Sequence, residues 1–452
     1  MSLVVSAFQF LLSHTPLLYL TQSIWRDEAF SILAAKEPLL HFLPTLTFEP
    51  PLYYILLHFW IKLFGTSEVA VRSLSLVGFL IACSVVVVWS EKRFGKHFLS
   101  WVTPLTFILN PMLLYYAFEA RAYGWFMAFI ALALYGYLEK KWIIFTTATI
   151  LGFYTHVYMI FFPIVTTLHF LITEYRHISL KHVFQQKYIQ SIALVSLCML
   201  PWIIVSSSHI SKLSSSWYFP VDLHLITSVL GNMFLGYEGT PWYLWGWTAF
   251  GSLVLLGLMA ILLISKHQRK TNLFILLLVA APLTLVLGFS LLVKPMFTNR
   301  YFLPVTFGEI FLVVSVLEMI KNKSVQVLLS ALYVGFLLWV NIWYPPLHPK
   351  LPIRDTITQI NSLKKPSDVV FATSPLIFFE TIYYSTHPES VYLYNPDESA
   401  FPWYVGDSLV KPSQMARDLP LYPTRAFLVH EDGSYTLMYR SPIQTTALKL
   451  KK

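Results

Sequence analysis

Three consecutive charged residues follow the first apolar stretch of the chain. The segment "SIWRDEAF" places Arg26, Asp27 and Glu28 together, in a sequence of which only 12% is charged. A carboxylate can take the proton of a hydroxyl nucleophile, and a guanidinium can bind phosphate oxygens through two parallel hydrogen bonds. Charges beside an apolar segment also serve as anchors at a membrane boundary. The segment therefore has two interpretations, a catalytic group or a boundary anchor.

Similar mixtures of acid, cation and tyrosine recur in other short segments. The segment "FEPPLYYILLHFW" carries Glu49, "YYAFEARAYGW" carries Glu119, Arg121 and Tyr123, "YTHVY" carries His156, and "KPMFTNRYFLP" carries Lys294, Arg300 and Tyr301. These residue types could bind an anionic group and move a proton. We take them as candidate site residues if the surrounding elements bring them to one face.

The elements that must position them are membrane spans. The chain has 452 residues and is 56% hydrophobic, with a mean hydropathy of +0.60, whereas a soluble protein is about 25% charged. Its apolar runs fit a polytopic α-helical membrane protein with about eleven spans. We expect these near 2–20, 68–89, 98–114, 122–138, 142–155, 157–173, 189–206, 242–264, 272–293, 301–319 and 324–343.

The charged loops predict the orientation. Lysine and arginine are concentrated in short loops on alternate turns, and such loops are typically cytoplasmic. These loops are 91–96, 139–141, 174–187, 266–270 and 321–323. We therefore expect a multi-pass protein of the cell (plasma or inner) membrane, with a cytoplasmic N-terminus. This orientation accounts for the net charge of +9 without a nucleic-acid partner.

The outer side is expected to carry two long loops and a soluble domain. The loops are 21–66 and 207–240, and residues 1–344 form the membrane module that includes the first loop. Residues 345–452 are expected to form an extracytoplasmic α/β domain, because helix and strand patterns alternate there. The expected helix is 353–365, and the expected strands are 367–373, 389–395, 425–431 and 435–441.

The positions of the acids separate three classes of function. Most acids of the membrane part fall on the outer side, as expected for an enzyme acting on a lipid-linked substrate. A transporter or lipid-linked sugar flippase would place charge pairs inside its spans. Glu309 alone is predicted to lie within a span. It is either a paired structural group or part of a site. A third class is a non-catalytic sensor or assembly subunit, which would tolerate replacement of Asp27.

The sequence resembles the GT-C glycosyltransferases. The resemblance lies in the Asp-Glu pair followed by "PPLYYILLHFWIKLFGTSEVAVRSLS", "YYAFEARAYGWFM", "YTHVYMIFF" and "RYFLP", from about Ser23 to Pro304. The nearest branch is similar to bacterial relatives of the protein O-mannosyltransferases and of the ArnT-like aminoarabinose transferases. Many relatives have histidine just before the two prolines, where this chain has Glu49, so the class of acceptor stays open.

The resemblance implies a reaction and roles for several residues. It implies inverting transfer of a sugar from a polyprenyl-phosphate donor to an acceptor hydroxyl or similar group at the outer face of the membrane. Asp27 matches the acid that activates the acceptor, and Arg300 with Tyr301 matches the motif for the donor phosphate. The second acidic element is matched by Glu119, Arg121 and Tyr123. The acceptor would be a lipid, a glycan or a protein, and membrane lipids surround the chain.

Other candidates keep two interpretations each. Glu28 either orients Asp27 or hydrogen-bonds the acceptor, or it only starts a helix. His156 is a satisfied core histidine or a substrate contact, and Ser206 to Phe219 is a lid or a connector. Lys294 is suited to phosphate because it lies on the outer side, against the usual trend for basic residues. No His/Cys cluster has metal-ligand spacing, so no cofactor is assigned, although Asp27, Glu28, Glu49 and Glu119 could hold a divalent metal.

Overall fold

The computed structural model describes residues 2–174, 185–215, 218, 220–236 and 242–441. The chain divides into two compact units. The helical unit comprises Met1–Leu20, Thr47–Tyr53 and Arg72–His348, and the mixed unit comprises Thr21–Leu46, Tyr54–Val71 and Pro349–Lys452. The mixed unit thus combines most of the predicted first outer loop, residues 21–66, with the C-terminal region. The functional boundary near residue 344 stays a prediction.

Apolar helices build the helical unit. They are α1 (Ser2–His14), α6 (Glu68–Phe94), α7 (Leu99–Ile108), α8 (Pro111–Ala117), α9 (Tyr123–Leu138), α10 (Trp142–Thr155), α11 (Phe161–Thr173), α12 (Lys187–Ser207), α13 (Leu223–Leu235), α14 (Trp245–Ile264), α15 (Arg269–Leu292), α16 (Leu303–Glu318) and α17 (Lys323–Trp343). Short 3-10 segments lie between some of them, namely η2 (Val157–Ile160), η5 (Ile210–Ser215), η6 (Trp242–Leu244), η7 (Asn299–Phe302) and η8 (Pro345–Leu347). Helices α2 (Leu17–Thr21), α5 (Leu52–Phe64) and α6 contribute residues to both units.

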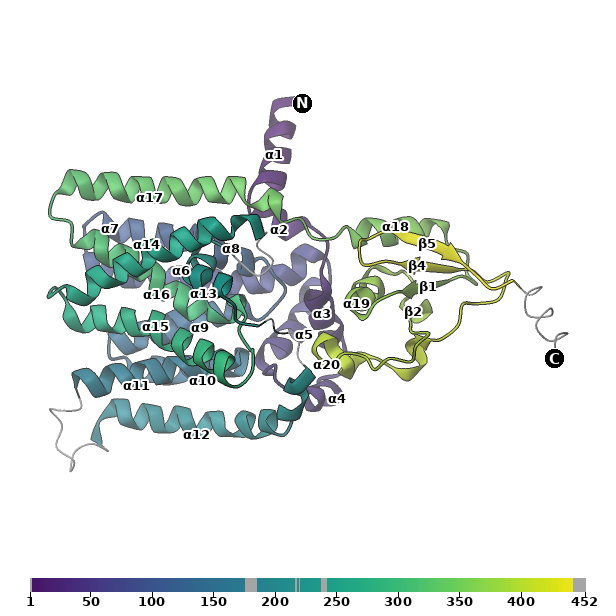
Figure 1. The fold of residues 1–452 in the computed structure, drawn as a ribbon, viewed down its shortest axis with the longest axis horizontal. Helices are drawn as coiled ribbons and strands as arrows, with labels where there is room; N and C mark the ends of the chain where they lie inside the picture. Colours follow the sequence, from purple (N-terminus) through teal and green to yellow (C-terminus); the bar gives the residue numbers. More distant parts are fainter. Residues whose placement is uncertain (1, 175–184, 216–217, 219, 237–241, 442–452) are drawn as a thin grey trace. The chain divides into compact units, whose positions relative to one another are not determined.

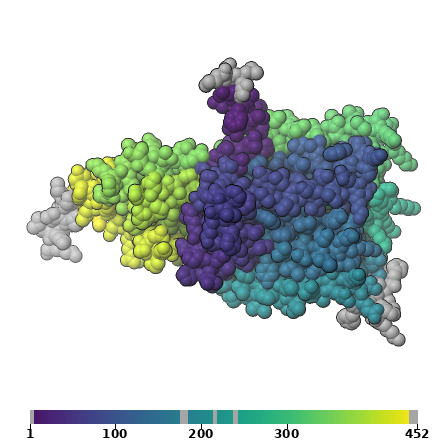
Figure 2. Space-filling model, turned by 180° about the vertical axis from the view of Figure 1, so that it is seen from behind, coloured from purple at the N-terminus to yellow at the C-terminus, as the bar shows by residue number. Residues whose placement is uncertain are grey.

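The helical unit is a membrane bundle. Within the described residues, six helical segments are long and apolar enough to cross a membrane, and shorter apolar helices accompany them. Helices α11, α12, α14, α15, α16 and α17 run nearly parallel (Figure 1). Figure 2 shows the blue-to-teal helices between α6 and α12 forming one continuous face. Large side chains such as Leu80, Trp101 and Ile143 are exposed in this unit, as expected where helices contact lipid rather than water. The predicted polytopic helical fold is confirmed.

Two predicted spans are interrupted at a proline. The span predicted over 2–20 is divided between α1 and α2 near Pro16, and the span over 98–114 is divided between α7 and α8. Pro111 opens α8, and the Asn110 side chain accepts a hydrogen bond from the Leu113 backbone N–H at 3.1 Å. Proline is well suited to the first turn of a helix and poorly suited to its interior. Apolar length alone therefore overestimated these two elements.

The segment 207–240, predicted as a long outer loop, contains the helix α13. The Asp222 side chain caps α13 by accepting the Leu225 backbone N–H at 2.8 Å. Gly231 faces α14 so closely that a Cβ atom there would lie 1.8 Å from the Thr248 carbonyl oxygen. The helix has 13 residues, which is too short for the length expected of a membrane span.

The mixed unit contains a five-stranded sheet. The strands are β1 (Val369–Ala372), β2 (Val391–Tyr394), β3 (Met415–Ala416), β4 (Ala426–Val429) and β5 (Tyr435–Met438), in the order β3-β2-β1-β4-β5. Val370 pairs with Val391 and with Phe427 in parallel register, while β5 pairs antiparallel with β4. The central strands β1 and β4 are the most apolar and the most buried, as expected for parallel strands. The predicted α/β character of residues 345–452 is confirmed.

Helix α19 (Pro375–Tyr384) packs on β1 and β2 of this sheet, and several helices accompany the sheet in the same unit. They are α3 (Arg26–Lys36), α4 (Leu39–Phe42), α18 (Ile353–Leu363) and α20 (Trp403–Gly406), with η1 (Leu43–Thr45), η9 (Pro388–Ser390), η10 (Asp407–Leu409) and η11 (Pro412–Gln414). The Phe30 ring of α3 packs edge-on against Phe379 of α19, with ring centroids 5.6 Å apart. Gly406 has φ of +122°, and a Cβ atom there would lie 2.3 Å from the Phe30 ring. These contacts hold the start of α3 beside α19.

Candidate active site

The Asp-Glu pair occupies the first turn of α3. Carboxylates are favourable there, because the N-terminus of a helix carries partial positive charge. The Trp25 backbone N–H donates to Glu28 Oε2 at 3.3 Å. This contact supports the helix-start interpretation of Glu28. The segment "WRDE" thus begins the helix and fixes the direction of both carboxylates.

Glu28 is fully buried and is held by a distant residue. Its Oε2 atom lies 3.1 Å from Lys350 Nζ, and the Lys350 side chain is only 9% exposed. A buried charge needs a well-placed partner, because its removal from water is costly. Glu28 is therefore fixed in place within this unit. Lys350 could not be predicted as this partner, because it lies far from Glu28 in the chain.

Asp27 is the more accessible member of the pair. Its side chain is 12% exposed, and its Oδ1 atom accepts a hydrogen bond from Arg26 Nε at 2.9 Å. The Ser31 hydroxyl donates to the Asp27 carbonyl at 2.9 Å and so leaves the carboxylate unaffected. Of the two acids, Asp27 is the one that could reach a substrate.

A third acid, Glu380 of α19, lies near the same helix start. Glu380 is 5% exposed. Burial raises the pKa of Glu380 to about 8, although the Arg26 backbone amide and the charges of Arg26 and Lys350 favour its ionised form. The Glu28 carboxylate acts in the same direction as burial. No spacing in the sequence connects "FFET" with "WRDE". Glu380 could therefore not be predicted as a neighbour of the Asp27–Glu28 pair.

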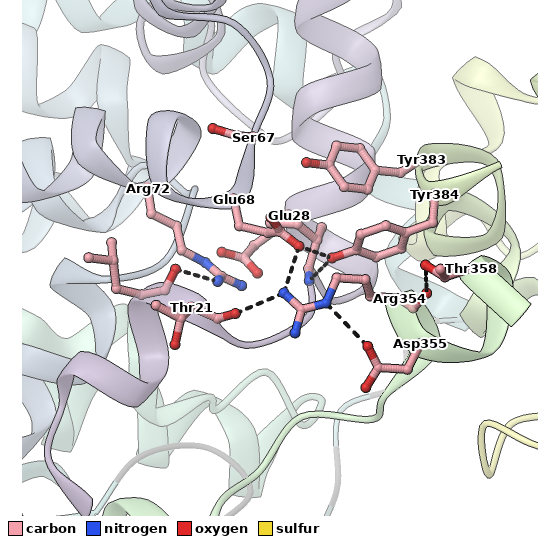
Figure 3. Close-up of polar contacts among 12 residues, drawn as sticks. Thr21, Glu28, Ser67, Glu68, Arg72, Arg354, Asp355, Thr358, Tyr383 and Tyr384 are labelled. Carbon is pink, nitrogen blue, oxygen red and sulfur yellow. Dashed lines mark hydrogen bonds and ion pairs between the residues drawn. The ribbon is translucent and has the colours of Figure 1, made fainter. Parts of the chain in front are cut away.

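Figure 3 shows the polar network that holds the segment before α3. Glu68, in the first turn of α6, accepts hydrogen bonds from Arg354 at 3.2 Å and from the Tyr384 hydroxyl at 2.9 Å. Arg354 also donates to the Thr21 carbonyl at 3.0 Å, and the Ile24 backbone N–H donates to the Tyr384 oxygen at 2.7 Å. These partners come from α6, α18 and α19. They fix the chain immediately ahead of Asp27.

The helical unit holds a second group of candidates, at the turn between α8 and α9. Arg121 Nη2 lies 2.7 Å from Glu49 Oε1. The Ser75 hydroxyl of α6 donates to the Arg121 carbonyl at 2.7 Å. Gly124 allows this close approach, since a Cβ atom there would lie 1.9 Å from the Ser75 carbonyl oxygen. The contact between α6 and α9 therefore places Arg121.

The late motif lies next to this turn. Arg300 and Tyr301 belong to η7, Arg300 is only 4% exposed, and its guanidinium lies 5.7 Å from the centre of the Tyr301 ring. Both Arg300 and Arg121 lie within electrostatic range of Tyr123, as does Glu119. Two motifs that lie far apart in the sequence are thus brought together. Their cations form the basic part of the helical unit's site.

His156 packs among aromatic rings in this group. Its ring stacks on Phe126 with centroids 4.7 Å apart and lies 4.9 Å from Tyr301. Its Nδ1 atom accepts the Tyr158 backbone N–H at 3.3 Å. Arg121 and Arg300 both act on it electrostatically. One ring nitrogen thus has a structural role, which favours the core-histidine interpretation for that atom.

Lys294 belongs to the same sequence motif as Arg300, and Tyr218 contacts that motif. Lys294 follows α15, and its Nζ atom is inaccessible, with no hydrogen-bond partner among the residues that the structure describes. Tyr218 hydrogen-bonds the Tyr301 side chain and lies within electrostatic range of Arg300. The sequence predicts a lid or a connector over Ser206 to Phe219, the segment that contains Tyr218. It carries no signal for Tyr218 itself. The lid and connector interpretations of that segment stay open.

Glu309 is buried in α16, and neither carboxylate oxygen has a hydrogen-bond partner among the described residues. The paired interpretation of Glu309 therefore gains no support.

In the part of the chain that the structure describes, no group of three His, Cys, Asp or Glu side chains is arranged to hold a metal ion. Cys83 and Cys198 are both free.

These observations define a multi-pass helical membrane protein with two clusters of acids and cations, one in each unit. The sequence matches no family model and no curated protein. Crystal structures of ArnT from Cupriavidus metallidurans share the fold. The apo structure aligns with a TM-score of 0.60 at 12% identity and covers 99% of this chain and 93% of ArnT. The structure bound to undecaprenyl phosphate gives 0.57 at 11% identity, covering 99% of this chain and 94% of ArnT. The chain therefore shares the fold of these ArnT structures.

Proposed function

We propose that the protein is a membrane glycosyltransferase that moves a sugar from a polyprenyl-phosphate donor to an acceptor, with inversion at the anomeric carbon. One observation carries the proposal. The buried Arg300 and its neighbour Arg121 form a cationic cluster in a fold shared with an ArnT structure that holds undecaprenyl phosphate. A guanidinium binds phosphate oxygens through strong charge-assisted hydrogen bonds, so this cluster suits the phosphate of a lipid donor.

The cationic cluster acts on the leaving group. As the bond between the anomeric carbon and the phosphate oxygen breaks, the phosphate gains negative charge. Arg300 provides a planar fork that suits two phosphate oxygens. Arg121 is held by Glu49 at 2.7 Å and supplies further positive charge, and Lys294, from the same sequence motif as Arg300, is a further candidate cation. Because phosphate is a good leaving group, the reaction needs no general acid.

Asp27 acts on the acceptor. The acceptor oxygen forms a new bond to the anomeric carbon, and its proton passes to the Asp27 carboxylate as that bond forms. General-base help of this kind contributes about 10²–10⁴-fold to a rate. The Arg26 guanidinium orients the Asp27 carboxylate, and the N-terminus of α3 is a favourable place for negative charge. Glu28, fixed by Lys350, supports the geometry of the pair.

The remaining expectations belong to the same proposal. The reaction takes place at the outer face of the cell membrane, the N-terminus is cytoplasmic, and residues 345–452 lie outside. The acceptor is a lipid, a glycan or a protein with a hydroxyl or similar group. The lysine and arginine residues of the short loops on alternate turns support this orientation.

The test uses purified protein in liposomes with a panel of polyprenyl-phosphate sugars and candidate acceptors. The measured quantity is released polyprenyl phosphate. We expect one donor to be turned over by the wild type, Asp27→Asn to lose turnover but keep donor binding, and Arg300→Ala to lose donor binding. Undiminished turnover in Asp27→Asn would contradict the assignment of the base. Function in cells that survives both substitutions would favour a non-catalytic assembly subunit.

Glu309 favours a second candidate function. A buried carboxyl group without a hydrogen-bond partner among the described residues is typical of transport or proton pathways in membrane proteins. A lipid-linked sugar flippase would move its substrate across liposomes without releasing polyprenyl phosphate. Loss of that movement in Glu309→Gln, with no chemical turnover in the wild type, would select the flippase.

A further inference from the structure

Glu380 is placed at the start of α3 by the packing of its neighbours. Phe379, the preceding residue of α19, contacts the Phe30 ring at 5.6 Å between centroids. Gly406 lies against the same ring. The backbone amide and the guanidinium of Arg26 both act on the Glu380 carboxyl group. Glu380 therefore belongs to the surroundings of the Asp27–Glu28 pair, although it comes from the C-terminal region.

The carboxyl group of Glu380 has an unusual environment. The residue is 5% exposed, and its Oε2 atom has no hydrogen-bond partner among the residues that the structure describes. A buried carboxylate usually accepts several hydrogen bonds, because the ionised form is costly without them. The neutral acid requires fewer partners. This geometry favours a protonated Glu380, in agreement with its raised pKa of about 8.

The cations near Glu380 already have other partners. Arg26 lies 2.9 Å from Asp27, and Lys350 lies 3.1 Å from Glu28. Charged groups that act on Glu380 are Arg26 and Glu28 from α3 and Lys350 from the segment before α18. On α19 itself, Glu380 is the only acidic or basic residue. An ionised Glu380 would compete with Asp27 and Glu28 for these two cations.

We propose that Glu380 is a positioning residue for Asp27, which by staying neutral leaves the Arg26 guanidinium to Asp27 and the Lys350 ammonium to Glu28. This inference rests on the proposed function, in which Asp27 is the base. It assigns the C-terminal region a part in catalysis through the charge state of one side chain. Ionisation of Glu380 would draw Arg26 away from Asp27 and Lys350 away from Glu28, and the base would then be misplaced. Binding of the donor phosphate would not change.

The first experiment measures the pH dependence of polyprenyl phosphate release in the full-length protein. We expect wild-type kcat to fall about tenfold per pH unit above about pH 8, as for loss of a single essential proton, with the KM for the donor unchanged. Glu380→Gln, which keeps a neutral side chain of the same shape, should lack this decline. Glu380→Ala should lower kcat about tenfold, as expected for a lost buried contact, and Gln should restore it. Glu389→Gln, an exposed acid of the same unit, is the matched control and should keep the wild-type profile.

The second experiment does not depend on turnover. Infrared titration of the full-length protein should show the carbonyl stretch of a protonated carboxyl group at pH 7, absent in Glu380→Gln. When this carbonyl stretch disappears at higher pH, the carboxylate band of Asp27 should shift. That band is identified by its absence in Asp27→Asn. An ionised Glu380 at pH 7, an unshifted Asp27 band, or an identical alkaline decline in Glu380→Gln would overturn the inference. No turnover of any donor by the wild type would instead overturn the proposed function, and the infrared titration would still decide the role of Glu380.

Discussion

Lys350 Nζ lies 3.1 Å from Glu28 Oε2, although 322 positions separate the two residues in the chain. Glu28 is completely buried, and Lys350 is nearly so. An acid of the first outer loop thus has its cation in the C-terminal region. The two segments form part of one compact unit, so the C-terminal region contributes to the setting of the Asp27–Glu28 pair.

Replacement of Lys350 by methionine should destabilise this unit. The change leaves Glu28 buried without this cation, and breaking a buried pair typically costs about 3–5 kcal/mol. Thermal unfolding in detergent should show a lower Tm for Lys350→Met. The double variant Glu28→Gln with Lys350→Met should recover much of the loss, because no buried charge remains. Lys365→Met, at an exposed position, is the control, and a Lys350→Met variant as stable as this control would contradict the prediction.

Arg300 should contribute through its shape as well as its charge. Arg300→Lys keeps the charge but loses the planar fork, and Arg300→Ala loses both. Charge-assisted hydrogen bonds contribute about 1.5–3 kcal/mol, so we expect kcat/KM for the donor to fall about 10–100-fold in Arg300→Ala and by less in Arg300→Lys. Steady-state kinetics at varied donor concentration would measure this. Arg269→Ala, at an exposed position, should behave like the wild type; equal activity of all four proteins would remove Arg300 from the site.

Gly124 should not tolerate alanine. A Cβ atom there would lie 1.9 Å from the Ser75 carbonyl oxygen, so α6 and α9 would have to separate and Arg121 would move with the turn. Gly124→Ala should lower both the Tm and the turnover. Gly257 of α14 has no atom within 4 Å of the corresponding position, and Gly257→Ala should be neutral or slightly stabilising, because alanine is favoured over glycine in helices by about 1 kcal/mol. Equal behaviour of the two variants would show that the helix contact is not tight.

The stability of Glu380→Gln relative to the wild type should depend on pH. The pKa of Glu380 is raised from 4.5 to about 8 in the folded protein, so the folded state holds a proton that the unfolded state releases above pH 4.5. Wild-type stability should therefore fall as pH rises between these values and become constant above the folded pKa. Each pH unit corresponds to about 1.4 kcal/mol, giving about 3 kcal/mol at pH 7. Glu380→Gln should lack this dependence. If the Tm of the wild type and the Tm of Glu380→Gln changed in parallel from pH 5 to pH 9, the raised pKa of Glu380 would be contradicted.

The sequence by itself determined most of the elements. Long apolar runs fix membrane helices, because every backbone polar group in a bilayer must be bonded within the helix. The alternation of one amphipathic helix with short apolar strands predicted the sheet of residues 345–452, including β1, β2, β4 and β5. Local signals failed where an element was short or contained a proline, as at α13 and Pro111. The candidate residues of the Asp-Glu pair and of the Arg121 and Arg300 motifs could also be named from the sequence.

Only the tertiary structure decided which distant side chains accompany them. The partners Lys350 and Glu380 of the acidic pair, and Tyr218 beside Tyr301, lie far from these motifs in the chain. Nothing in the local sequence around Lys350 or Glu380 connects either residue with the Asp27–Glu28 pair. Burial and Coulomb interactions depend on separation in space, and sequence spacing reports that separation only within one helix or one strand. The charge state of Glu380 follows from packing that joins α3 to α19 across hundreds of residues, and no local pattern encodes it.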